Sequence, residues 1–226
     1  MKRYSDKYLK DWNKFINDST PAFAEFFHKE QLFYQSMVHE GYRVLDIGSG
    51  TGRIACAIAP YVGEKGVVYA IERNEKMHAN LYSYFNNIRY TKHPSDVRTF
   101  NKSIDVAIFS CNGFGNIPQT EAHEITERIR MLLARNQDKG AFIGAVYSED
   151  AAPYQIEQYK KIGWNDVYIS NDTVCSDSLD FVSKRYTQDE LLFFLEKYFD
   201  TFSVGEISPI AYGFIGARAK GSKVKT

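Results

Sequence analysis

The folding pattern of this chain is set by Arg43-Val44-Leu45-Asp46-Ile47-Gly48-Ser49-Gly50-Thr51-Gly52-Arg53. The aliphatic run 44–47 predicts a buried strand, and the run 54–59, Ile-Ala-Cys-Ala-Ile-Ala, predicts a helix. Between them, Gly48, Gly50 and Gly52 allow the backbone to take positive φ and to lie close to a bound molecule. A strand, a glycine loop and a helix in this order predict a site for a nucleotide-like ligand.

The acid in this loop narrows the choice of ligand. Asp46 ends the strand two residues before the first glycine, where a carboxylate would repel a pyrophosphate and attract a cationic or hydroxyl-bearing ligand. The glycine spacing is G-x-G-x-G, whereas dinucleotide-binding proteins have G-x-G-x-x-G, which disfavours an NAD-dependent oxidoreductase. Residues 46–52 resemble the D-x-G-x-G-x-G motif of class I S-adenosylmethionine-dependent methyltransferases, with no departure.

A second acid supports the ligand site. Gly66–Ile71 predicts the second strand, and Glu72 closes it about 20 residues after the loop, where nucleotide-binding βαβ units place the acid that accepts ribose hydroxyls. The alternative is that the glycine loop has a purely structural role and packs a helix tightly on the sheet. Two signals at matching spacing favour a binding site.

The resemblance implies S-adenosylmethionine as the cofactor and a doubly wound, Rossmann-like α/β sheet of seven mostly parallel strands with an antiparallel last strand. In the family, an acid after the third strand contacts the adenine amino group; Asp96 matches that place, and it can also cap a helical turn. Met77 matches a position where the family often sets an apolar side chain against the adenine. The expected cofactor-binding residues are Asp46, Gly48, Ser49, Gly50, Gly52, Glu72, Arg73, Met77, Asp96, Val97, Ser110 and Cys111.

The loop at 110–118, Ser-Cys-Asn-Gly-Phe-Gly-Asn-Ile-Pro, follows a predicted fourth strand, Ile104–Phe109, that is apolar on both faces. Ligands of open α/β sheets bind beyond the carboxyl ends of the strands, so this loop should face the transferable methyl. It resembles the G-N-F/L/I loops of small-molecule N-methyltransferases, and it does not resemble the N/D-P-P-Y/F loops of enzymes that methylate nucleobases or glutamine amides. Asn112 and Asn116 are therefore the expected catalytic residues, although Asn-Gly and Gly-Asn are also ordinary turn formers.

Aromatic residues and one arginine are the candidates for binding the substrate. The predicted helices Asp6–Ile16 and Pro21–Val38 carry more rings than one buried stripe requires. Since the segment before the first motif commonly forms a lid in this family, the resemblance implies that some of these rings line a substrate pocket; a helical pair packed on the sheet is the alternative. Arg185 can bind a substrate carboxylate with its fork, although surface arginines beside helix starts are equally common. The expected substrate-binding residues are Phe23, Phe27, Phe114 and Arg185.

Together with the remaining pattern, the resemblance implies a single methyltransferase domain, 1–226. It comprises a helical lid (1–40), a cofactor-binding core (41–147), a substrate-cap insertion (148–185), and a closing helix with antiparallel strands (186–219). The insertion is longer than a connecting loop in a compact domain. A capping box at 187–190 should begin the closing helix, Leu191–Phe199. The other expected elements are helices at Asn74–Asn86 and Glu121–Asn136 and strands at Ile88–Thr91, Gly140–Tyr147, Thr201–Ile207 and Ala211–Ala217.

Charge and composition exclude several classes of partner. Lys plus Arg equals Asp plus Glu at 28 each, which gives no global field toward nucleic acid or an acidic membrane. The 3 cysteines lack disulfide or zinc spacing, and the 5 histidines lie in unrelated segments, which disfavours a metal. No signal peptide or membrane-spanning run is evident. We expect a soluble cytoplasmic protein, a monomer or a homodimer, with a small-molecule substrate and no nucleic acid or membrane partner.

Methyl transfer from a sulfonium is an in-line displacement that depends on proximity and orientation, so a catalytic triad is not required. The predicted activity is S-adenosylmethionine-dependent methylation of a small molecule, at an amino group of an amino acid or related metabolite. The alternatives are O-methylation of a hydroxyl or carboxyl, and a module that binds the cofactor but has lost turnover.

Overall fold

The structure, a computed structural model, describes residues 6–74, 77, 85–90, 96–136 and 140–219. Its helices are α1 (Asp6–Asn17), α2 (Pro21–Met37), α3 (Arg53–Val62), α5 (Gln119–Ala134), α6 (Ala152–Lys161) and α7 (Gln188–Glu196), with short 3-10 helices η1 (Val97–Thr99) and η2 (Glu149–Ala151). The helix predicted at Asn74–Asn86 lies mostly outside the described residues. No helix in the described ranges is long and apolar enough to cross a membrane.

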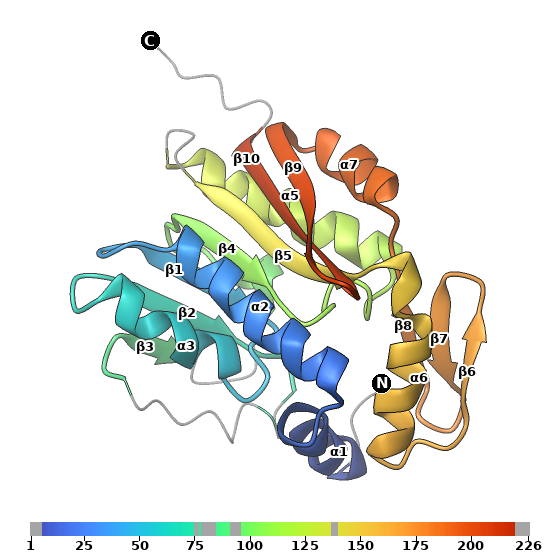
Figure 1. Ribbon diagram of the computed structural model, residues 1–226. Coiled ribbons are helices and arrows are strands. Elements are labelled where there is room, and N and C mark those ends of the chain that lie inside the picture. The colour runs from blue at the N-terminus through green and yellow to red at the C-terminus, as the bar shows by residue number, and fades with distance from the viewer. Residues whose placement is uncertain (1–5, 75–76, 78–84, 91–95, 137–139, 220–226) are drawn as a thin grey trace.

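A seven-stranded sheet forms the centre of the molecule (Figure 1). Its strands are β1 (Arg43–Ile47), β2 (Val67–Ile71), β3 (Ile88–Tyr90), β4 (Val106–Phe109), β5 (Ala141–Tyr147), β9 (Phe199–Ser208) and β10 (Ala211–Ala219). They lie in the order β3-β2-β1-β4-β5-β10-β9, and β10 is antiparallel to both of its neighbours. The predicted fold class is confirmed, including the antiparallel strand at the end of the chain.

Strand side chains alternate between two cores, one on each face of the sheet. Val44 packs with the core under α2 and α3, whereas the next residue, Leu45, packs with the core under α5 and α7. Val106 and Ala107 of β4 divide in the same way. Successive side chains of a strand point to opposite faces of the sheet, and helices cover both faces. The central parallel strands are therefore apolar throughout. Figure 1 shows α2 and α3 across the face toward the viewer and α5 behind it.

The closing helix departs from its predicted bounds, and the helix α2 begins without a side-chain cap. The capping box of α7 is present, with Thr187 and Glu190 bonded reciprocally. However, the helix ends at Glu196, and Phe199 already begins β9, so the predicted helix at Leu191–Phe199 starts and ends too late. Thr20 is the N-cap residue of α2, but its side chain makes no capping hydrogen bond.

The insertion between β5 and α7 is an ordered unit of its own. It contains η2, α6 and a three-stranded antiparallel sheet of β6 (Val167–Ser170), β7 (Thr173–Ser176) and β8 (Phe181–Lys184). Its α6 lies beside the N-terminal helices, where Gln158 Nε2 donates to Phe15 O at 3.1 Å and Gln158 Oε1 accepts from Thr20 N at 2.6 Å. Trp164 Nε1 also donates to Asp11 Oδ2 at 2.8 Å. The two segments predicted as lid and cap are therefore joined to each other beside the sheet.

Candidate active site

The glycine loop lies where the carboxyl ends of β1 and β2 meet. Gly48, Gly50 and Gly52 have φ of +64°, +57° and +86°, a left-handed region that favours glycine. Ser49 N donates to Ile71 O at 3.0 Å, which fixes the loop against the end of β2. The loop then leads directly into α3, so it has the strand–loop–helix arrangement predicted from the sequence.

A cleft of about 130 Å³ opens above this loop. Of the predicted cofactor residues, Asp46 and Gly52 are not among its lining, although both belong to the glycine motif. The rest of the predicted set does line it: Gly48, Ser49, Gly50, Glu72, Arg73, Met77, Asp96, Val97, Ser110 and Cys111, together with the predicted catalytic residue Asn116. These residues come from the ends of β1, β2 and β4 and from η1, which places the cleft at the edge expected for an open α/β sheet.

Glu72 forms part of the wall of the cleft and supports its loop. The side chain is buried, and its carboxylate accepts hydrogen bonds from Gly50 N at 2.9 Å and Asn74 N at 2.8 Å. Charged acceptors of this kind make stronger hydrogen bonds than neutral ones. Glu72 therefore ties the glycine loop to the segment after β2, in addition to facing the cleft.

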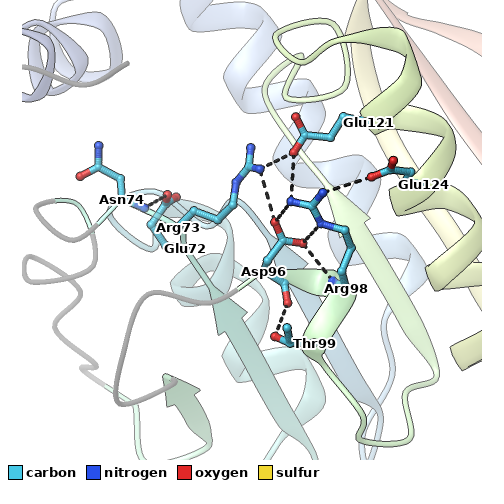
Figure 2. Close-up of polar contacts among 8 residues, drawn as sticks. All are labelled: Glu72, Arg73, Asn74, Asp96, Arg98, Thr99, Glu121 and Glu124. Atoms are coloured by element: carbon cyan, nitrogen blue, oxygen red, sulfur yellow. Dashed lines mark hydrogen bonds and ion pairs between the residues drawn. The ribbon is translucent and has the colours of Figure 1, made fainter. Parts of the chain in front are cut away.

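A network of charged side chains borders the same end of the cleft (Figure 2). Arg98 contacts Asp96 through Nε and Nη2, at 2.9 and 2.6 Å, and Arg73 Nη1 contacts both Asp96 and Glu121. Asp96 also caps η1 by accepting from Arg98 N at 2.9 Å, which confirms the capping alternative raised for this residue. The Arg98 guanidinium and this capping bond lower the pKa of Asp96 despite its partial burial. Asp96 is therefore a carboxylate held in a fixed orientation at the cleft.

Asp46 is fully buried behind the glycine loop, whereas the sequence predicted that its carboxylate would face the ligand. Its Oδ2 accepts from Ala55 N at 3.1 Å, near the start of α3, and its Oδ1 has no partner among the described residues. Burial raises its pKa to about 7, although the nearby Arg53 charge acts in the opposite direction. Asp46 therefore stabilises the turn from strand to helix. Its burial destabilises the ionised form of the carboxyl, which is the form present at high pH.

This burial predicts a specific dependence of stability on pH. Because the folded-state pKa is raised, the stabilising effect of the proton is complete below the unfolded pKa and is lost as pH rises toward about 7. Asp46→Asn should remove that dependence. Between pH 5 and pH 8 the free energy of unfolding of the ligand-free variant should rise by about 2–3 kcal/mol relative to that of wild type. Thermal melts of both proteins at the two pH values check this; an advantage for asparagine that stays constant with pH would contradict it.

The two predicted catalytic asparagines have different surroundings. Asn112 is buried, and its Nδ2 donates to Ser183 Oγ at 2.9 Å and Lys184 O at 3.1 Å, while its Oδ1 accepts from Tyr147 N at 3.1 Å. Both of its N–H groups are used within the protein, so it ties the loop after β4 to β8 and does not face the cleft. Asn116 lines the cleft and is the asparagine that remains placed to contact a substrate.

A second, smaller cavity adjoins the cleft. The two share Trp12, Cys111 and Asn116 in their linings. Beyond these the second cavity is bounded by hydrophobic and aromatic side chains: Phe15, Tyr147, Tyr159, Ile162, Trp164 and Phe181. The rings pack closely, with Tyr159 stacked on Trp164 at 5.1 Å between centroids, and Phe181 edge-on to both. The space left is about 10 Å³, room for about one water, so the rings must move to admit a substrate.

The rings predicted to line a substrate pocket are core residues. Phe23 and Phe27 are buried behind the second cavity, where both pack edge-on against Phe15. Phe114 is buried in the opposite core, between the rings of Phe109 and Phe194. Because all three already fill protein interior, they do not line either cavity. The helical pair packed on the sheet, left open as an alternative, describes Phe23 and Phe27 correctly.

Arg185 is buried at the end of β8 and lines neither cavity. Its Nη2 donates to Asn171 O at 2.6 Å, while Nε and Nη1 have no hydrogen-bond partner among the described residues. Burial lowers its pKa. Its predicted contact with a substrate carboxylate stays a prediction.

Trp12, Arg53 and Glu30 are among the residues of the site that were not singled out from the sequence. Trp12 lines both cavities, and Arg53, the residue after the glycine loop, lines the cleft. Glu30 is fully buried and contacts Arg53. A signal for Glu30 was present, since an acid in the middle of an apolar helix face must have a buried partner. No signal distinguishes Trp12 from the other rings of its helix.

Known proteins share this architecture. A protein of Pyrococcus horikoshii OT3, PH0226, superposes with a TM-score of 0.71 at 15% identity, covering 96% of this chain and 100% of that one. The magnesium protoporphyrin IX methyltransferase ChlM of Synechocystis PCC 6803, solved with bound SAH, superposes with a TM-score of 0.62 at 13% identity, covering 94% and 95%. At these identities the likeness establishes the fold.

Sequence similarity establishes the family. A family model described as a methyltransferase domain matches residues 44–136. The ubiquinone/menaquinone biosynthesis C-methyltransferase UbiE of Blochmanniella floridana is 31% identical over 188 residues, covering 64% of this chain and 74% of that protein. The chain belongs to the class I S-adenosylmethionine-dependent methyltransferases. This methyltransferase transfers the methyl group of S-adenosylmethionine to a small molecule.

The cleft of the methyltransferase fits this cofactor. The Ser49 hydroxyl lines the cleft, is buried, and has no hydrogen-bond partner among the described residues, as expected of a group that a polar ligand would satisfy. The cleft also offers a fixed carboxylate at Glu72 for ligand O–H groups, and Asp96 lines its other end with its oxygens bound to Arg98 and, at the longest distance, to Arg73 at 3.3 Å. Bound S-adenosylmethionine supplies the activated methyl group, and the protein supplies binding and orientation.

Proposed function

We propose that this methyltransferase N-methylates a small amine bound in the ring-lined second cavity, with Asn116 positioning the nitrogen. In this proposal Glu72 accepts the ribose hydroxyls of the cofactor, and Asp96 accepts from the adenine amino group in place of its longest contact, that with Arg73 at 3.3 Å. The cavity shares Asn116 and Cys111 with the cofactor cleft, so an acceptor seated there would lie next to the cofactor. The proximity of the two sites is what transfer requires.

The observation that carries the proposal is the make-up of the second cavity, whose described lining contains no His, Asp, Glu or Lys side chain. Its titratable lining groups are Cys111, Tyr147 and Tyr159, and burial raises the pKa of each, that of Cys111 to about 12. All three therefore keep their protons at neutral pH and cannot act as a general base. An amine can lose its ammonium proton to water before it enters the cavity and then attacks with its lone pair, whereas a hydroxyl acceptor needs a base in the cavity to take its proton during the transfer.

The rings of the cavity favour an amine for a second reason. During transfer the positive charge of the sulfonium moves to the acceptor nitrogen, and aromatic faces stabilise a cation close to them. The same rings would disfavour a carboxylate, because they leave it desolvated and without a partner. Trp12 and Phe15 come from segment 1–40, and Tyr159, Trp164 and Phe181 come from segment 148–185. This supports the proposal that these segments act as the lid and the substrate cap.

Carbon methylation is the competing function. The name of the Blochmanniella floridana relative assigns it C-methylation in quinone biosynthesis, and a flat ring would suit an aromatic cavity. A phenolic ring carbon becomes nucleophilic chiefly when the phenol is deprotonated. The protonated groups of the second cavity therefore favour nitrogen over carbon.

An isotope experiment separates these functions. We expect the protein, incubated with a metabolite extract and S-adenosylmethionine carrying a ¹³C-methyl group, to yield a small product whose ¹³C-methyl shift is that of an N-methyl group. A Glu72→Ala variant, which should not bind the cofactor well, is the matched control for label transferred without the enzyme. A methyl signal bonded to carbon or oxygen would overturn the proposed acceptor.

A further inference from the structure

Glu30 is a carboxylate placed in the middle of an apolar helix face. It lies in α2 with buried Phe23, Phe26, Phe27 and Tyr34 on the same face, and its side chain has no exposed surface. Removing a carboxylate from water costs several kcal/mol unless partners replace the water. The groups that bind the Glu30 carboxylate therefore indicate its role.

Its two oxygens bind three groups from separate parts of the chain. Oε1 accepts from Cys111 N at 2.5 Å and from the Tyr34 hydroxyl at 3.1 Å, and Oε2 accepts from Arg53 Nη2. The Arg53 guanidinium also lies over the Phe27 ring, 4.9 Å from its centroid. Partial burial of the Arg53 guanidinium lowers its pKa, but the Glu30 charge outweighs this effect, so the pKa lies above its ordinary value. One side chain of α2 therefore fixes the residue after the glycine loop and the loop after β4.

Two of these partners belong to the active site. Arg53 lines the cofactor cleft, and Cys111 lines both the cleft and the second cavity. Cys111 has φ +54°, a conformation that costs a non-glycine residue about 1 kcal/mol or more. The hydrogen bond from its N–H to a buried carboxylate helps to hold that conformation. Glu30 itself lines neither cavity, so it acts through these two residues.

The direction of the cofactor in the cleft follows from the second cavity. If the second cavity holds the acceptor, as in the proposed function on which this step rests, the methyl group must face it. The sulfonium and the amino-acid part of the cofactor then lie toward Trp12, Cys111 and Asn116, the residues that the two cavities share. The ribose and adenine lie toward the charged network of Asp96 shown in Figure 2.

We propose that Glu30 is a positioning residue for the amino-acid end of S-adenosylmethionine, because it holds Arg53 and the Cys111 backbone in place there. Glu30→Gln preserves the volume of the side chain but removes its charge. The amide also turns one acceptor into an N–H donor that faces other donors. Arg53 and the Cys111 loop should then lose their fixed orientation, while the ribose and adenine end of the cleft is unchanged.

Titration calorimetry with two ligands tests this without an acceptor. S-adenosylhomocysteine carries the amino-acid part, whereas 5′-methylthioadenosine has the adenine and ribose but lacks it. We expect Glu30→Gln to bind S-adenosylhomocysteine about tenfold or more weakly, the size of effect expected for a lost charged hydrogen bond, and to bind 5′-methylthioadenosine as wild type does. Tyr34→Phe, which removes only the third partner of Glu30, is the matched control and should bind both ligands as wild type does.

A second variant keeps the test valid if Glu30→Gln does not fold. Arg53→Lys retains the charge but not the planar fork, and it should produce the same selective loss for S-adenosylhomocysteine. An equal loss for both ligands would show a structural role only, and no loss for either would also overturn the proposal. A carbon- or oxygen-methylated product together with the selective loss would refute the proposed acceptor and leave the Glu30 assignment standing.

Discussion

S-adenosylmethionine is expected to bind the Glu72→Gln variant about ten- to hundredfold more weakly than wild type. Both ribose hydroxyls can donate to a carboxylate, but an amide offers only one oxygen, and losing a hydrogen bond to a charged group costs about 1.5–3 kcal/mol. The same carboxylate accepts from Gly50 N and Asn74 N, so the variant also weakens the support of the glycine loop. Titration calorimetry measures the affinity, and thermal melts measure the accompanying loss of stability.

Glu121→Gln is the matched control for this experiment. Glu121 belongs to the charged network beside the cleft and contacts Arg73, but it is not part of the cleft lining. Neutralising it should change the affinity for S-adenosylmethionine far less than neutralising Glu72. If a folded Glu72→Gln protein binds the cofactor as tightly as wild type, Glu72 is not the acid that accepts the ribose hydroxyls.

Trp164→Ala is expected to cause the largest loss of stability of the substitutions considered. Trp164 is buried, stacks on Tyr159, packs edge-on against Phe181, and donates to Asp11 of α1. Truncating a buried tryptophan costs about 3–5 kcal/mol, which corresponds to a fall of roughly 6–20 °C in Tm for a chain of this size. Differential scanning calorimetry measures the shift.

Trp164→Phe separates the ring from its hydrogen bond. A phenylalanine ring preserves most of the contact with Tyr159 and Phe181 but cannot donate to Asp11, so we expect a loss of about 1–2 kcal/mol. If Trp164→Ala melts within 2–3 °C of wild type, a shift of about 1 kcal/mol or less, then the insertion does not depend on this ring to hold its place beside α1.

The cofactor half of the site was predictable because its signals are local. The glycine loop needs positive φ at fixed positions, and Glu72 must follow the second strand at a fixed distance, so both patterns are visible in a few residues. The mostly parallel seven-stranded sheet with its antiparallel last strand followed from alternating strands and helices and from the resemblance at residues 46–52. These inferences required no knowledge of how distant segments pack.

The acceptor side was less predictable because it depends on packing between distant segments. Helical periodicity shows that Phe15, Phe23 and Phe27 share apolar faces, but the approach of α6 decides that Phe15 lines a cavity while the other two are covered. Asn112 and Asn116 are four residues apart in one loop. Hydrogen bonds to Ser183 and Lys184, about seventy residues away in the chain, direct the Asn112 side chain into the protein interior.

The position of β10 in the sheet has a consequence for the order in which the chain can fold. β5 has β4 on one edge and β10 on the other, where Tyr147 pairs with Ala211. All of the insertion, α7 and β9 must therefore be synthesised before the second edge of β5 has its partner. Until then the edge of Ala-Phe-Ile-Gly-Ala-Val-Tyr, a strand without a charged or strongly polar side chain, stays open on the ribosome. Such an edge can pair with another chain, so nascent copies that stall before residue 211 are the form of this protein most prone to aggregate.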